Sequence, residues 1–223
     1  MRKAKPPAAQ AKKRRPLSPE AIVAAAIRLA DEGDLEAVSI RGVAAELNAR
    51  AMSLYDHFAS KDDLLAAMAD EVVGEMLVSR PLPEDWREAV AISAGKMFAT
   101  FVAHPWLIFV FAGGPRPGPN SVKLAKQMAG AAAGLQLERD DVWTVQGIVN
   151  DYVIGYSFRT VTSANPQALE KEIGSSDVVE FPELATLPDN IRRRSSRDRF
   201  DLGLQTVLDG IERRFAQTPP LDC

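Results

Sequence analysis

The spacing of apolar residues along the chain predicts helices from residue 18 onward. Apolar side chains recur at intervals of three and four residues, which places them on one face of a helix. The strict alternation of apolar and polar residues that marks a half-buried strand does not occur. The pattern therefore predicts an all-α fold.

Four helical segments are predicted near the N-terminus. Ser18, Ser39 and Ser60 each stand directly before an apolar-periodic stretch, where a hydroxyl can cap the first turn. Gly33 ends the first segment, and Asn48 lies where the chain must reverse between the second and the third. Two short helices joined by a tight turn, with a longer helix on each side, form a helix-turn-helix arrangement.

The third of these segments is short and is predicted at about Ala51–His57. Its residues Leu54 and Phe58 lie four positions apart, so both point inward on a helix. We expect them to form the small core of the helix-turn-helix together with Leu47.

The rest of the chain also reads as helix, with an irregular stretch at about residues 164–198. The longest uncharged run, Met97–Pro115, has His104-Pro105 near its middle. Proline disfavours helix at the residue before it, so we interpret the run as a helix end, a break and a new buried helix, not a membrane span. The predicted helices are Trp86–Ala103, Trp106–Ala112, Ser121–Leu135, Asp140–Thr162 and Arg199–Ala216.

Charge is distributed unevenly, although the formal net charge is only −3. The first fifteen residues carry seven basic and no acidic side chains, whereas residues 16–80 carry five basic and twelve acidic ones. A basic arm, predicted to be disordered, therefore precedes an acidic segment. Such arms bind nucleic acid or anionic lipid, or simply keep a protein soluble.

Composition limits the chemistry that the chain can perform. Cys223 is the only cysteine, which excludes an internal disulfide and a cysteine-based metal site and fits a cytoplasmic location. No apolar segment follows the basic N-terminus, so we expect no signal peptide. The chain has no Gly-x-Ser-x-Gly motif, phosphate loop, dinucleotide fingerprint or cysteine nucleophile. We therefore predict no catalytic residues, no metal and no cofactor.

The string "SLYDHFASKDDLL" (Ser53–Leu65) and the "SIRGV" that opens the second helix identify a family. With the capped first helix, they resemble the TetR family of transcriptional regulators. "DYVIGYSF" (Asp151–Phe158) and "RFDLGLQTVLDGIERRF" (Arg199–Phe215) are similar to the ligand-binding domains of the tetracycline-repressor subgroup.

This resemblance implies a basic tail at residues 1–17, a DNA-binding domain at 18–78 and an effector-binding and dimerisation domain at 79–223. It also implies a homodimer that pairs through the helices at about 140–162 and 199–216. Such a dimer binds a palindromic operator in double-stranded DNA and releases it when a small molecule binds.

The resemblance assigns phosphate contacts to Tyr55 and His57, whose OH and NH groups suit phosphate oxygens. Lys61 is expected to add a phosphate contact through its charge and the start of its helix. Tyr55 could instead only pack on its helix, and Lys61 could be a solvated lysine. Asp56 departs from the family pattern, because a carboxylate near phosphates lowers affinity unless it points away or pairs with a base.

Base-edge contacts are expected from residues around the third helix. Arginine can pair with guanine and methionine can touch a thymine methyl, although the arginines could be plain surface residues. The tail could enter a minor groove or only aid solubility. The expected base-reading residues are Arg41, Arg50, Ala51, Met52 and Ser53, and the tail residues are Lys12, Lys13, Arg14 and Arg15.

Effector binding is expected in the C-terminal half, with a largely hydrophobic ligand. Gln146, Asn150 and Ser157 form a polar stripe that orients a ligand or bridges the dimer. His104 could equally cap or pack a helix end. Trp143, like most of the aromatic residues here, is expected in the core. The predicted ligand residues are Met97, Phe101, His104, Trp106, Phe109, Gln146 and Asn150.

A different class of function remains open at this point. The chain could be a helical small-molecule-binding protein or an enzyme whose helix-turn-helix is vestigial, and only the acidic N-terminal region and Asp56 support this. An activator would use the same DNA contacts as a repressor.

Overall fold

The computed structural model describes residues 17–33, 35–113, 117–135, 137, 139–162 and 195–215. Within these ranges the regular structure is helical, and the all-α fold is confirmed. The elements are α1 (Pro19–Glu32), α2 (Ile40–Glu46), α3 (Ala51–Tyr55), α4 (Lys61–Met76), α5 (Trp86–Ala103), α6 (Trp106–Ala112), α7 (Pro119–Ala131), η1 (Ala133–Leu135), α8 (Arg139–Thr162) and α12 (Ser196–Phe215).

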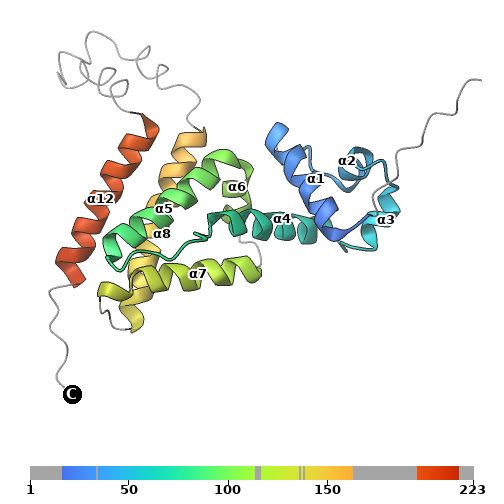
Figure 1. Ribbon diagram of the computed structural model, residues 1–223. Helices are drawn as coiled ribbons and strands as arrows, with labels where there is room; N and C mark the ends of the chain where they lie inside the picture. Colours follow the sequence, from blue (N-terminus) through green and yellow to red (C-terminus); the bar gives the residue numbers. More distant parts are fainter. Residues whose placement is uncertain are drawn as a thin grey trace, which may run out of the picture.

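The helices form two groups that α4 connects (Figure 1). We call the described part of residues 17–60, with α1–α3, the head, and the described part of residues 77–215 the body. In the body α5 packs against α8, and α8 against α12; α1 of the head packs on α4. The predicted tail up to residue 16, and residues 164–194 of the stretch predicted to be irregular, lie outside the described residues. The last residues of that stretch are helical instead, because α12 begins at Ser196.

Serine caps start three of the first four helices, as predicted. Each serine side chain accepts a hydrogen bond from a backbone N–H in the first turn, which stabilises a helix by about 1 kcal/mol. The pairs are Ser18 with Ala21, Ser39 with Gly42 and Ser60 with Asp63.

The turn and the core of the head also follow the sequence. Asn48 has a φ of 50°, the left-handed conformation that Asn tolerates. Leu54 and Phe58 are buried, and Leu47 is partly buried against them. The predicted end of α3 is wrong by two residues, because the N–H groups of His57 and Phe58 both turn back to the carbonyl of Leu54. That tight turn places the Phe58 ring in the core.

An aromatic cluster joins α5, α8 and α12 in the body. The rings of Phe98 and Phe200 stack with centroids 4.3 Å apart. The Tyr152 hydroxyl donates to the Phe200 carbonyl at 2.7 Å, and the Tyr156 hydroxyl donates to Ser196 at 3.0 Å. Burial raises the pKa of Tyr152 to about 12. These contacts fix α12 along α8 at several points.

Two body helices start earlier than predicted, because side chains cap them. The Asp70 carboxylate accepts hydrogen bonds from the backbone N–H groups of Asn120 and Ser121, and α7 begins with Pro119. The Ser195 hydroxyl accepts from the N–H of Asp198, and α12 starts at Ser196.

The long uncharged run is divided as predicted between α5 and α6, with His104 and Pro105 at the break. None of the helices in the described ranges is long and apolar enough to cross a membrane.

Expectations of burial were wrong for two aromatic residues. Phe109 is 51% exposed and Trp143 is 62% exposed, whereas Met97, Phe101 and Trp106 are buried as expected. Phe109 and Trp143 lie on α6 and α8, where apolar residues occupy more than one face of the helix.

Close packing of α8 on α12 predicts opposite effects for two glycines of α12. A Cβ at Gly203 would clash with the Tyr152 hydroxyl, whereas a Cβ at Gly210 meets nothing within 4 Å. We expect Gly203→Ala to destabilise the protein by about 1–3 kcal/mol. Gly210→Ala should stabilise it by up to about 1 kcal/mol through helix propensity. Thermal melts followed by circular dichroism measure both, and equal melting temperatures would contradict the packing described.

Candidate nucleic-acid interface and effector site

The outer face of α3 is exposed on the head. Met52 is 74% exposed, and Arg41 of α2 and Arg50 at the start of α3 are also exposed. Ala51 and Ser53 are half-buried. The predicted base-reading residues therefore lie on α2, on α3 and at the residue before α3. Their guanidinium groups and thioether are suited to guanine and to a thymine methyl.

The predicted phosphate contacts cluster where α3 ends and α4 begins. Tyr55 and His57 are exposed at the end of α3, and Lys61 is exposed in the first turn of α4. The Lys61 ammonium lies 3.5 Å from the Leu35 carbonyl, a long contact at the surface. Together a hydroxyl, an imidazole and an ammonium present hydrogen-bond donors to an anionic partner.

Negative charge borders this face. Asp56 is exposed between Tyr55 and His57, and no ion pair joins it to Arg41 or Arg50 among the residues with described coordinates. The pKa of Glu20, at the start of α1, is lowered, first by a hydrogen bond from Ser18 and to a lesser degree by His57. The predicted tail contacts, Lys12–Arg15, lie outside the described residues.

The predicted effector residues come from three helices that pack together. Met97 and Phe101 lie on α5 and are buried, and the Phe101 ring meets Phe111 of α6 edge-on at 5.7 Å. Phe109 of α6 lies 6.2 Å from Phe158 of α8, ring centroid to centroid.

Three polar side chains of α8 have buried oxygens that find no hydrogen-bond partner among the residues the structure describes. They are Gln146 Oε1, Asn150 Oδ1 and Ser157 Oγ. Positions 146, 150 and 157 share one face of a helix. A buried polar atom without a partner is costly, so such atoms commonly bind a water or a ligand. The sequence had indicated this stripe, and the structure adds that its oxygens are unpaired.

Trp106 and Phe109 line a cavity of about 440 Å³ between the end of α1 and the start of α6. Its other lining residues are Ala30, Asp31, Gly33, Leu35, Glu36 and Pro105. This cavity therefore lies between head and body and not inside the body.

His104 faces the head. Its Nδ1 lies 2.8 Å from Asp31 Oδ1, and its Nε2 lies 3.3 Å from Glu75 Oε2. Both ring nitrogens are thus engaged by carboxylates, which leaves neither free for an effector in this arrangement. Neither Asp31 nor Glu75 could be predicted as a partner from the sequence, because both lie far from His104 along the chain.

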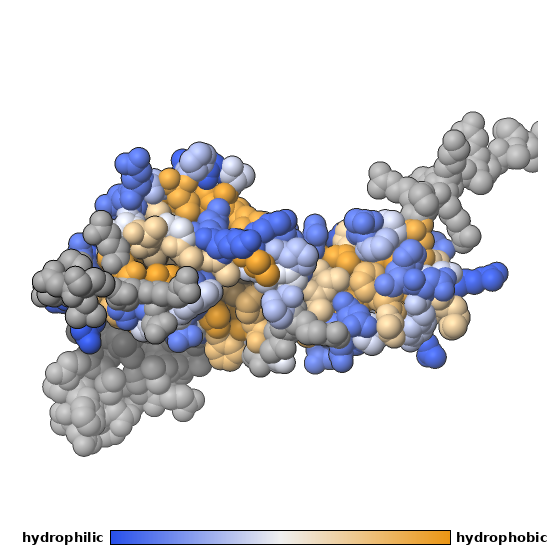
Figure 2. Space-filling model, turned by 90° about the horizontal axis from the view of Figure 1, so that it is seen from below, coloured by the Kyte–Doolittle hydropathy of each residue, from blue (hydrophilic) through white to orange (hydrophobic). Residues whose placement is uncertain are grey.

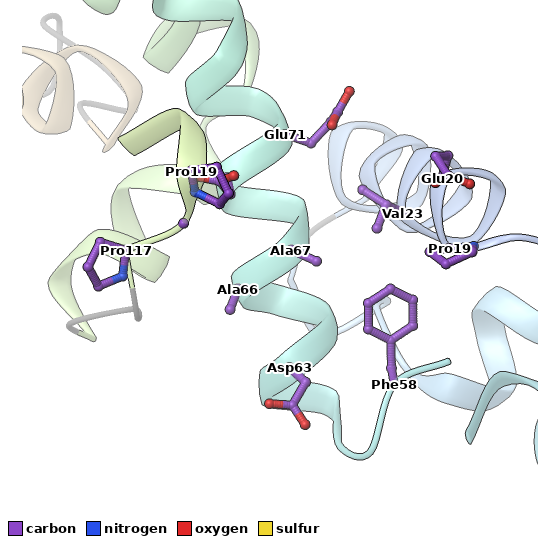
Figure 3. A pocket seen from close by; sticks show the side chains of 12 residues that line it. Pro19, Glu20, Val23, Phe58, Asp63, Ala66, Ala67, Glu71, Pro117 and Pro119 are labelled. Atoms are coloured by element: carbon purple, nitrogen blue, oxygen red, sulfur yellow. The ribbon is translucent and has the colours of Figure 1, made fainter. Parts of the chain in front are cut away.

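A second cavity, of about 480 Å³, opens between the start of α1, the first half of α4 and the start of α7. Figure 3 shows the Phe58 ring between α1 and α4, with Val23 across from it. None of the predicted effector residues lines this cavity.

Two family models cover the chain. Residues 22–68 match the bacterial regulatory proteins of the tetR family, and residues 80–215 match the tetracyclin repressor-like C-terminal domain. The chain belongs to the TetR family. It is therefore a DNA-binding transcriptional regulator, and the resemblance read from the sequence is confirmed.

Individual relatives agree with this assignment. An HTH-type transcriptional regulator of Saccharopolyspora erythraea is 32% identical over 62% of this chain, a match that spans 59% of the relative. The repressor DrrR1 of Streptomyces coeruleorubidus is 28% identical over 90% of this chain and 79% of its own. ActR of Streptomyces coelicolor, in complex with actinorhodin, is 26% identical with a TM-score of 0.77, over 92% of this chain and all of that one.

The position of Lys61 yields a prediction about salt dependence. Lys61→Ala should weaken binding to all DNA sequences alike and reduce the slope of log affinity against log salt by about 1. Fluorescence anisotropy with labelled duplexes over a range of salt concentrations measures the slope. Lys96→Ala removes an equally exposed lysine from α5 and should leave it unchanged. An unchanged slope in Lys61→Ala would place this lysine away from the phosphates.

Proposed function

We propose that the chain is a homodimeric repressor that binds a palindromic operator and is released by a small, largely hydrophobic effector. Residues 18–78 would form the DNA-binding domain and 79–223 the effector-binding and dimerisation domain. The protein would act in the cytoplasm, with no catalytic residues and no cofactor. The observation that carries the proposal is the exposed outer face of α3 on a capped, packed head of a TetR-family chain.

Each half-site would be read by one head. Arg41, Arg50 and Met52 would meet base edges, with half-buried Ala51 and Ser53 beside them. Tyr55, His57 and Lys61 would fix the register on the phosphates. The basic residues Lys12–Arg15 would add salt-dependent affinity along the adjoining groove.

Dimer formation is supported by apolar surface on α8 and α12. Ile148 and Phe158 of α8 and Leu202 of α12 are exposed, although each is large and apolar. Apolar surface is also visible on the body in the space-filling view (Figure 2). Burying these side chains against a second copy would remove them from water, and two such helices from each copy would form a four-helix interface.

Effector binding is supported by the unpaired oxygens of α8. A ligand with hydrogen-bond donors on an otherwise apolar frame would satisfy Gln146 and Asn150, while Met97 and Phe101 of α5 would supply apolar contact. The structure of ActR in complex with actinorhodin supports a small-molecule site in this chain as well. Trp106 and Phe109 would contribute from α6.

Release of DNA requires that the effector favour one spacing of the two heads. A ligand shifts an equilibrium only by the difference between its affinities for the two states. The effector would therefore bind best to a body in which the heads do not fit two successive major grooves.

Selection of bound duplexes from random DNA, at a stated salt near physiological ionic strength, tests the proposal. We expect enrichment of an inverted repeat, because a two-fold dimer presents two identical heads. The same selection with Tyr55→Ala/Lys61→Ala should enrich nothing. If the intact dimer also enriched nothing, the alternative of a small-molecule-binding protein or an enzyme with a vestigial helix-turn-helix would be favoured.

The proposed interface has its own test in a pair of matched variants. Leu202 on α12 is 53% exposed and Val122 on α7 is 50% exposed. We expect Leu202→Glu to raise the dimer dissociation constant by at least tenfold, because it places charge in an apolar contact. Val122→Glu should have no effect. Sedimentation velocity measures the dimer dissociation constant of each variant. Equal constants for Leu202→Glu and Val122→Glu would show that the interface does not include Leu202 of α12.

A further inference from the structure

A polar contact joins the head to the body beside the break between α5 and α6. His104 is the first residue after α5, and Asp31 lies in the last turn of α1. Glu75 lies in the last turn of α4. The imidazole thus lies between two helices that belong to different parts of the molecule.

We propose that His104 is a positioning residue: a tie that holds the end of α1 to the start of α6 and so fixes the orientation of the head on the body. The assignment rests on the proposed function, because the orientation of the head also sets that of the proposed DNA-binding face. His104 itself would contact neither effector nor DNA.

The partners of His104 define what its ring nitrogens can do. Asp31 and Glu75 are carboxylates and only accept hydrogen bonds, whereas a neutral imidazole has one donor and one acceptor. Distances of 2.8 Å to Asp31 and 3.3 Å to Glu75 are satisfied together when both ring nitrogens donate. The imidazole is 12% exposed and Asp31 29%, so water screens this contact less than it screens a surface ion pair. The contact with Glu75, which is 55% exposed, is screened more.

Asp31 receives a second donor from the body. The indole N–H of Trp106 donates to the same Oδ1 at 2.7 Å, and the Trp106 side chain is buried. The Asp31 carboxylate of α1 therefore contacts two body side chains, His104 at the α5–α6 break and Trp106 at the start of α6.

The adjacent cavity explains why this tie is important for the position of the head. The 440 Å³ cavity lies between the end of α1 and the start of α6, so apolar packing there is incomplete. The bonds of Asp31 to His104 and Trp106 cross the same gap. Without them, α1 would be held in the head and on α4 but not against α6.

The two residues that contact Asp31 lie on either side of the break between α5 and α6. Pro105 separates His104 from Trp106, and α6 begins directly after it. The two side chains that bind Asp31 are therefore both fixed at the same end of α6.

The intrachain distance between head and body tests the tie without operator or effector. Spin labels are placed at Ala45→Cys in α2 and Lys126→Cys in α7, both exposed, in a Cys223→Ser background. Labelled chains are mixed with excess unlabelled chains, so that the measured distance lies within one chain. Double electron–electron resonance then gives the distance distribution.

We expect His104→Ala to broaden or shift this distribution relative to the parent. Asp31→Asn, which removes the charge, should do the same, and the double variant should add nothing. His104→Asn, whose amide can replace Nδ1 as donor to Asp31, should restore part of the narrow distribution. Arg87→Ala is the matched control, since Arg87 bridges Asp209 and Glu212 at 2.6 and 2.8 Å within the body.

If the distance distribution between the two spin labels is unchanged in a folded His104→Ala variant, the proposed role of His104 is wrong. Thermal melts show which variants are folded. If His104→Ala does not fold, the distance distribution of Asp31→Asn decides the question instead. Operator binding is then measured on the same proteins, where loss of the tie should change the dissociation constant by about fivefold or more. Failure to find any operator would count against the proposed function, but the distance measurement would still decide the tie.

Discussion

The proposed DNA-binding face is built on a helix of five residues, which is too short to be stable by itself. Isolated helices shorter than about 12 residues are marginal in water, so α3 is fixed by what surrounds it. Leu54 packs its inner face into the core, and Phe58 is buried just after its last turn. The left-handed conformation of Asn48 reverses the chain between α2 and α3. The exposed residues Met52 and Tyr55 therefore have a defined direction only because Leu54 and Phe58 are buried.

The same dependence extends along α4 into the body. Its first residue, Lys61, belongs to the proposed phosphate-binding face, and its penultimate residue, Glu75, contacts His104 at the body. With a rise of 1.5 Å per residue, its 16 residues span about 24 Å. The head is thus joined to the body at two places, along α4 and through the Asp31–His104 contact.

Local signals in the sequence predicted most of the helices, because they depend on neighbouring residues. Ser18, Ser39 and Ser60 gave the starts of three helices, and the His104-Pro105 pair gave the break between α5 and α6. Caps from distant residues were not predictable: α7 starts early because Asp70 caps it from across the fold. The proposed DNA-binding residues came from the family motif, because spacing alone would not have assigned them.

The body site was predicted less completely. Periodicity identifies a buried face only when the other faces are polar, and α6 is apolar all round, so the exposure of Phe109 was missed. The pairing of His104 with Asp31 joins residues far apart in sequence and follows from tertiary packing. The stripe of Gln146, Asn150 and Ser157 was visible from its spacing, but its lack of partners was not.

A continuous apolar core runs through α4 from the head into the body, and this affects how such regulators can be recombined. Ile22 of the head, Met68 and Val72 of α4, and Phe98 of α5 belong to one cluster of buried side chains. The head is consequently not a self-contained module that could be exchanged at the start of α4. A new operator preference is more safely introduced by replacing the outer residues of α2 and α3 on this scaffold, with the inner face of α4 kept intact.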